Sequence, residues 1–193
     1  GSIVADLDEQ QSPGEFPAGT QRVADAAVTS RPGVVCAIQT ADCLPVLLAA
    51  SDASAVGAAH AGWRGLAGGV LETCVHALRA RATPGIGVIA WLGPAISAAH
   101  FEVGEEVRAA FVSTDEAAAE AFIRNPHGRW QCDLYELARQ RLSRLGIHDV
   151  TGGEHCTYAE PERFYSWRRD TTAGRTPGSG RMASLVWMPN PGC

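Results

Sequence analysis

Two short apolar runs, separated by a polar SDAS turn, constrain the fold of this chain more than any other feature. The runs cover residues 45–50 and 55–60, and this pattern predicts an antiparallel β-hairpin. With the turn centred between Asp52 and Ala53, residue 45 is expected opposite residue 60, because the turn fixes the register. Cys43 then lies within one diagonal step of His60, a distance that side chains bridge.

The sequence after the hairpin adds an anion-binding feature to this thiol and imidazole. His60 is followed by AGWRG, a glycine-bounded turn, and a helix is expected from near Leu66. A strand, a glycine turn and a helix expose backbone N–H groups and the positive end of a helix dipole. Arg64 adds a cation with bidentate geometry. We therefore predict a functional site here; the alternative is a core cysteine beside a structural histidine.

The rest of the chain predicts an α+β fold, in which one layered, mixed β-sheet domain is flanked by helices. Strands are expected at residues 34–39, 86–92, 147–150 and 182–188, and helices at 66–79 and 103–111. A further helix follows Asp133-x-x-Glu136, which resembles a capping box. Residues 10–20 and 163–181 are expected to be loops. The length of 193 residues fits a single domain spanning 1–193.

Charge and composition exclude several function classes. The net charge of −5 argues against a nucleic-acid partner, and no apolar run is long enough to suggest a membrane-spanning segment. All sixteen basic residues are arginines, which excludes Schiff-base and P-loop lysine chemistry. Phosphate must therefore be bound by arginines and backbone amides. The six cysteines form no C-x-x-C pair, so we expect free thiols and a cytoplasmic location.

An arginine-rich segment is the second candidate. FYSWRRD places Tyr165, Arg168 and Arg169 close together along the chain. Aromatic faces and guanidinium groups suit a base and a phosphate. The alternative is a solvated loop with arginine–carboxylate pairs.

Five motifs in order, TADCLPVL, AAHAGWRGL, WLGPAI…FEVGEEV, DLYELARQRL and CTY…FYSWRRD…GRMASLVW, resemble one bacterial family. This is the multicopper polyphenol oxidase, or laccase-domain, family of YfiH-like zinc-dependent purine nucleoside phosphorylases. The resemblance implies a fold similar to the cytotoxic-necrotizing-factor-like cysteine hydrolases. It implies phosphorolysis of adenosine, inosine, guanosine and methylthioadenosine, with adenosine deaminase activity in addition.

The resemblance also implies the ligands of a zinc ion. Cys43 of TADC and His60 of HAGWRG match two of them, whereas the third, a histidine, would lie upstream of Gly1. We therefore expect that the family's N-terminal segment is missing and that zinc binds weakly here, or with a substitute ligand such as His155. Arg64 with the segment's Arg168, Arg169 and Tyr165 would bind substrate and phosphate. Asp42 would support a metal ligand or accept a proton, or else cap a backbone turn.

Three other functions stay open. Copper binds His and thiolate sites tightly, but the His-x-His pairs of a multicopper oxidase are missing from this sequence. A cysteine hydrolase or deamidase would use Cys43 as nucleophile and His60 as base. A binding module for purine or phosphate would need no chemistry. The sequence makes no prediction of the oligomeric state.

Overall fold

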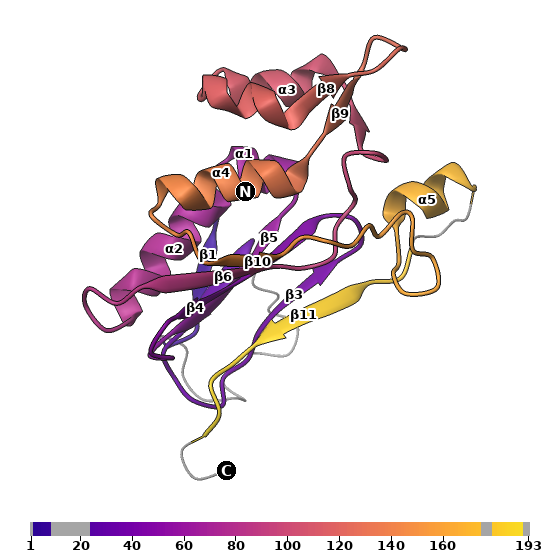
Figure 1. Cartoon of the computed structure of the whole chain (residues 1–193). Coiled ribbons are helices and arrows are strands. Elements are labelled where there is room, and N and C mark those ends of the chain that lie inside the picture. Colours follow the sequence, from indigo (N-terminus) through magenta and orange to yellow (C-terminus); the bar gives the residue numbers. More distant parts are fainter. Residues whose placement is uncertain (1, 9–23, 175–178, 191–193) are drawn as a thin grey trace.

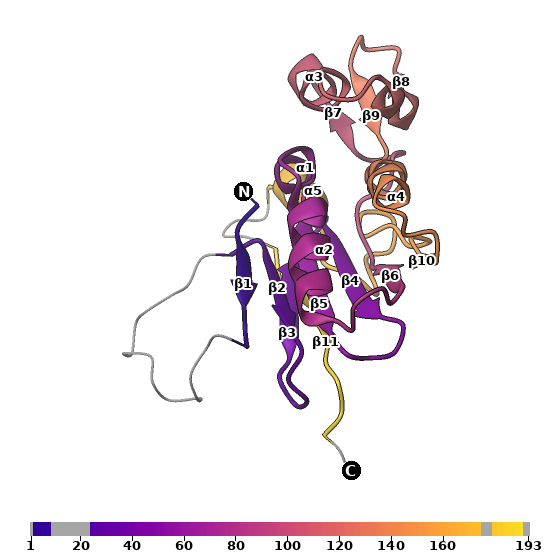
Figure 2. The same cartoon turned by 90° about the vertical axis from the view of Figure 1, so that its left-hand side faces the viewer.

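A six-stranded mixed sheet lies between a layer of helices and a two-stranded ribbon in the computed structural model (Figures 1 and 2). The structure describes residues 2–8, 24–174 and 179–190. The loop expected at residues 10–20 lies outside these ranges. The sheet order is β1 (Val4–Asp6), β2 (Ala26–Thr29), β5 (Val56–Ala61), β4 (Leu44–Ala50), β6 (Val88–Leu92) and β10 (Val150–Gly152). The two outer pairs, β1–β2 and β6–β10, are parallel and the inner pairs are antiparallel.

The predicted hairpin is confirmed as β4 and β5. Pro45 lies opposite His60, which is the predicted register. The Asp52 carboxylate accepts hydrogen bonds from the backbone and hydroxyl of Ser54, and Ala53 adopts a left-handed φ of 58°. The turn residues thus close one end of the hairpin, and Cys43 and His60 lie at the other, open end.

The helix expected at residues 66–79 is two helices. α1 (Trp63–Ala67) and α2 (Val70–Arg81) are separated by a glycine pair, in which Gly69 has a φ of 86° that favours glycine. The predicted apolar face of α2 is confirmed, because five residues are buried against the sheet and α4: Val70, Leu71, Cys74, Val75 and Leu78.

Only half of the predicted capping box forms at α4 (Leu134–Arg144). The Asp133 side chain accepts the Glu136 backbone N–H at 3.0 Å. The Glu136 carboxylate instead accepts a bond from Gln140, and the Asp133 N–H donates to the Ala121 carbonyl. α3 (Glu105–Val112) begins later than expected because a short strand, β7 (Glu102–Val103), precedes it.

The opposite face of the sheet is covered in part by the ribbon. β3 (Cys36–Thr40) pairs antiparallel with β11 (Met182–Val186), and Cys36 and Ile38 pack against Ala58 of β5. A separate, small three-stranded sheet consists of β7, β9 (Trp130–Cys132) and β8 (Phe122–Arg124). The 3-10 helix η1 (Glu116–Ala121) immediately precedes β8 in the chain. The predicted layered α+β fold is thereby confirmed.

The segment from residue 163 to 181, expected as a loop, contains the short helix α5 (Trp167–Thr172).

In the described part of the chain, no helix is long and apolar enough to cross a membrane.

Candidate active site

Cys43 and His60 face one small space at the open end of the hairpin. Cys43 immediately precedes β4, and His60 is the penultimate residue of β5. Both side chains border Gly62. A Cβ atom at Gly62 would stand 2.8 Å from the Cys43 Sγ and 3.7 Å from the His60 Nε2. A side chain at residue 62 would therefore collide with the Cys43 thiol, and glycine avoids this contact.

Burial favours the neutral forms of both groups. It raises the pKa of the Cys43 thiol, and the nearby Asp42 carboxylate raises it further, while the Arg181 guanidinium opposes this shift. Burial lowers the pKa of His60, against the opposing effect of Asp25. Neutral imidazole is the form that binds a metal ion, whereas the thiol must lose its proton.

The pair opens into a cavity of about 310 Å³. Its wall includes Arg64 of α1, Arg168 of α5 and Arg181, which precedes β11. The other lining residues are Gln39, Thr40, Ala41, Asp42, Trp63, Ile96, Phe101, Leu134 and Trp167. The structure thus places Asp42, Cys43, His60, Arg64 and Arg168 of the predicted site in one cavity.

Each arginine of the cavity lies over an aromatic ring. The Arg64 guanidinium carbon is 4.3 Å from the Trp63 ring centre, and the corresponding distances are 5.5 Å for Arg168 over Phe101 and 5.4 Å for Arg181 over Trp167. Such stacking fixes a guanidinium plane while leaving donors for an anion. The cavity therefore offers three cations and three aromatic faces.

Sequence reasoning missed Arg181, Trp63 and Phe101 as members of the site, and it included Trp167 only as part of the FYSWRRD segment. Trp63 and Trp167 stand inside the motifs AGWRG and FYSWRRD, so their position beside the chosen arginines was an available signal. Phe101 and Arg181 come from distant segments that only the fold brings to the cavity.

Arg169 and Tyr165, which were expected to bind substrate, do not line the cavity. The Arg169 guanidinium donates to the backbone carbonyls of Thr157, Tyr158 and Phe164 at 2.6 to 3.0 Å. All of these bonds hold the chain itself, so Arg169 has a structural role in this fold, and its expected role in binding substrate stays a prediction. Tyr165 is 53% exposed and its ring borders Gly180.

The donor set fits two ligands of a metal ion. A thiol and an imidazole in the wall of one cavity suit zinc or copper. Within the described residues, no group of three or more His, Cys, Asp or Glu side chains is placed to hold a metal ion. His155, the expected substitute, contacts Glu160 and the Phe164 ring instead, and it does not line the cavity.

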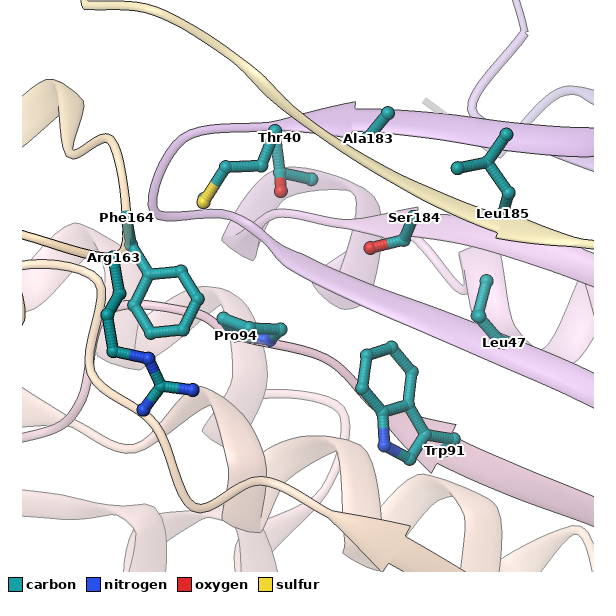
Figure 3. Close-up of a pocket in the computed structure, with 10 residues that line it drawn as sticks. Thr40, Leu47, Trp91, Pro94, Arg163, Phe164, Ala183, Ser184 and Leu185 are labelled. Carbon is teal, nitrogen blue, oxygen red and sulfur yellow. The ribbon is translucent and has the colours of Figure 1, made fainter.

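A larger hollow of about 520 Å³ lies between β11 and β6 (Figure 3). Apolar side chains dominate it, including Leu47, Trp91, Phe164 and Leu185, and the Phe164 and Trp91 rings border the space in the close-up. It has neither a thiol nor an imidazole in its wall. Its size alone therefore does not make it the candidate for chemistry.

The fold and the cavity together define a class, namely an α+β protein with a thiol and an imidazole in an arginine-lined, aromatic pocket. Residues 1–189 match the family model described as multi-copper polyphenol oxidoreductase laccase. The chain belongs to this family.

Two curated relatives are similar in sequence to most of this chain. The chain is 50% identical over 166 residues to the purine nucleoside phosphorylase YfiH of Escherichia coli K12, with 86% of this chain and 64% of that protein covered. It is similarly 50% identical to a Pseudomonas aeruginosa purine nucleoside phosphorylase, with 86% and 65% covered. The chain thus spans less than two thirds of the length of these relatives.

Two crystal structures have the same fold. A Neisseria meningitidis protein superposes with a TM-score of 0.84 at 44% identity, covering 98% of this chain and 72% of that one. YlmD from Geobacillus stearothermophilus superposes with a TM-score of 0.80 at 28% identity, covering 98% and 71%. The expected similarity to the cysteine hydrolases remains a prediction.

Proposed function

We propose that this chain is the catalytic part of a zinc-dependent purine nucleoside phosphorylase. The main support is the single cavity in which Cys43 and His60 lie beside three aromatic rings and three guanidinium groups. The printed names of the relatives favour the same activity. Adenosine, inosine, guanosine and methylthioadenosine are the proposed substrates, and adenosine deamination is a proposed second activity.

Cys43 and His60 would hold the metal in this proposal. Their position in the wall of one cavity supports this assignment, and the described residues place no third ligand beside them. Zinc is preferred over copper because it binds mixed His and thiolate sites that keep an open position. Bound there, zinc would supply a Lewis acid that polarises the reacting group.

The substrate would lie between the rings, with phosphate against the guanidinium groups. Purines stack on aromatic side chains, and Trp63, Phe101 and Trp167 offer such faces. Arg64 is exposed at the cavity edge, where it would orient phosphate toward the anomeric carbon. Arg168 and Arg181 would neutralise charge on the phosphate as the glycosidic bond breaks.

The pKa shifts favour a metal site over a cysteine hydrolase. A hydrolase that uses Cys43 as its nucleophile needs the thiolate, yet burial raises the pKa of the Cys43 thiol. Burial therefore opposes the reactive form of Cys43, whereas the lowered pKa of His60 keeps the neutral imidazole that a metal ion needs. A metal ion removes the conflict because it deprotonates a coordinating thiol.

The test measures zinc content and phosphate-dependent release of hypoxanthine from inosine. Cys43→Ser and His60→Gln should lose both zinc and activity, whereas His76→Gln should keep both, because His76 lies exposed on α2. The longer Escherichia coli relative serves as the positive control for phosphorolysis. Release of base without phosphate, or no release at all from zinc-loaded protein, would refute the proposal.

The same samples separate the alternatives. Metal-free protein that hydrolyses an amide and loses this activity on alkylation of Cys43 would establish a cysteine hydrolase. Oxygen uptake with a phenol in copper-loaded protein would establish a polyphenol oxidase. Binding of inosine without turnover would establish a binding module.

A cytoplasmic location is part of the proposal. The five cysteines in the described residues are free thiols, and a thiolate ligand of zinc needs a reducing compartment to stay reduced.

A further inference from the structure

We infer that Asp42 is a positioning residue that fixes α5, and with it the arginine and tryptophan of the substrate wall, to the loop that presents Cys43. The inference rests on the proposed function for its effect on catalysis, but its structural basis is independent of the reaction. We do not propose that Asp42 itself contacts the substrate.

The Asp42 carboxylate is buried and uses both oxygens on the protein. The residue is 8% exposed. Its Oδ1 accepts the Thr157 hydroxyl at 2.6 Å, and its Oδ2 accepts the backbone N–H of Arg168 at 2.6 Å. Charge-assisted bonds of this length are stronger than neutral ones. One side chain therefore connects two segments that lie far away in sequence.

The Asp42 backbone makes a third connection. Its carbonyl accepts the N–H of Ile96, another residue of the cavity wall, at 2.9 Å. Its φ is 82°, in the left-handed region that non-glycine residues seldom occupy and that aspartate tolerates best. This backbone turn sets the direction in which Cys43, the next residue, enters β4.

The position of Arg168 depends on this link. Asp42 binds the backbone of Arg168 and leaves the guanidinium to stack on Phe101 and donate to the Glu102 carbonyl at 3.1 Å. Trp167, the residue before it, begins α5 and supports Arg181. Removal of the carboxylate would therefore loosen the attachment of the ring and both cations of this wall, and α5 would then be held by the bonds of Ser166 and Arg169. A displacement of about 1 Å at such groups costs up to 100-fold in rate.

Four variants separate the side chain from the backbone turn. Asp42→Ala removes the carboxylate and strains the left-handed turn, whereas Asp42→Gly removes the carboxylate and relieves the strain. Asp42→Asn tolerates the turn and keeps one acceptor, and Thr157→Val removes one donor. Val75→Ala, a substitution in the buried face of α2, is the control, because it lowers stability without changing a residue of the cavity wall.

Amide exchange and steady-state kinetics report the outcome. In Asp42→Ala and Asp42→Gly, we expect exchange in residues 166–172 to be about tenfold faster, as loss of a hydrogen bond predicts. We expect kcat/KM for inosine to fall about 100-fold, mainly through a higher KM for phosphate. Asp42→Asn should restore most of both readouts, and Thr157→Val should lie between. Val75→Ala should change neither.

The two proposals fail in different ways. Wild-type protein without phosphorolysis would refute the proposed function, while faster exchange in the Asp42 variants would still support the link. Exchange in residues 166–172 that stays at the wild-type rate in Asp42→Gly would overturn the inference. So would a Val75→Ala variant with the same rise in KM, because the effect would then follow from lost stability alone.

Discussion

Gly62→Ala places one methyl group against the Cys43 thiol and near the His60 imidazole. The Gly62 backbone has φ −63° and ψ 159°, a conformation open to any residue, so strain in the backbone adds nothing. The new Cβ would stand 2.8 Å from the Cys43 Sγ, well inside the separation of roughly 3.5–4.0 Å at which heavy atoms attract. The sulfur must therefore move by about 1 Å.

The expected cost follows from this overlap. Overpacking of this kind destabilises by about 1–3 kcal/mol, which lowers the melting temperature by roughly 2–4 °C per kcal/mol in a chain of this size. The affinity for zinc should fall by about 10–100-fold, as for changes beside a metal ligand. Phosphorolysis at limiting zinc should fall with it.

The assay compares Gly62→Ala with Gly87→Ala. A Cβ at Gly87 would meet the Ser51 hydroxyl oxygen at 3.5 Å, an ordinary contact, so this control shares only the effect of alanine on the unfolded chain. Thermal unfolding and titration with cobalt(II), followed by its thiolate absorption band, give the two readouts. Equal zinc or cobalt affinity in Gly62→Ala and wild type would refute a metal between Cys43 and His60.

Three further predictions follow from the contacts and pKa shifts. Arg169→Ala should lower the free energy of unfolding by about 3 kcal/mol, since three partly buried carbonyls lose their donor, while Arg163→Ala, at an exposed ion pair, should cost less than about 1 kcal/mol in urea unfolding. Because the pKa of His60 is lowered in the fold, the stability it adds is present above about pH 6.5 and is lost as the pH falls through the lowered pKa; metal-free His60→Gln should show a shallower fall in its urea midpoint below that pH. Burial raises the pKa of three thiols, those of Cys36, Cys74 and Cys132, to about 12. Iodoacetamide at about pH 8 should therefore label the native protein at Cys43 and Cys156 before these three. Zinc should protect Cys43 from labelling, and mass spectrometry can measure both results.

The hairpin and its register were predictable because their determinants are local. The turn residues and the two apolar runs are adjacent in sequence, so Pro45 could be placed opposite His60 without knowledge of the rest. The meeting of Cys43 and His60 followed from that register. The break between α1 and α2 was also written locally, in Gly68 and Gly69, but the apolar spacing of the flanking residues concealed it.

The remaining parts of the site depend on contacts between distant segments. β1 and β2 are short strands whose pairing is set by neighbours, and β3 joins β11 across most of the chain. Phe101 and Arg181 reach the cavity only because these segments pack as they do. Sequence periodicity does not report contacts between distant segments, so Phe101 and Arg181 were missed as site residues.

The two adjacent arginines of α5 show why residue type alone does not define a role. Successive helical residues point about 100° apart, and of these two arginines Arg168 lines the cavity whereas Arg169 does not. The phase of the helix is set at its first turn, where the Ser166 hydroxyl accepts the N–H of Arg169 at 3.1 Å and Asp42 accepts that of Arg168. These two caps direct Arg168 to the cavity and Arg169 to the carbonyls of Thr157, Tyr158 and Phe164. A residue beside Cys43 thus helps to determine which arginine faces the cavity in which we propose that phosphate binds.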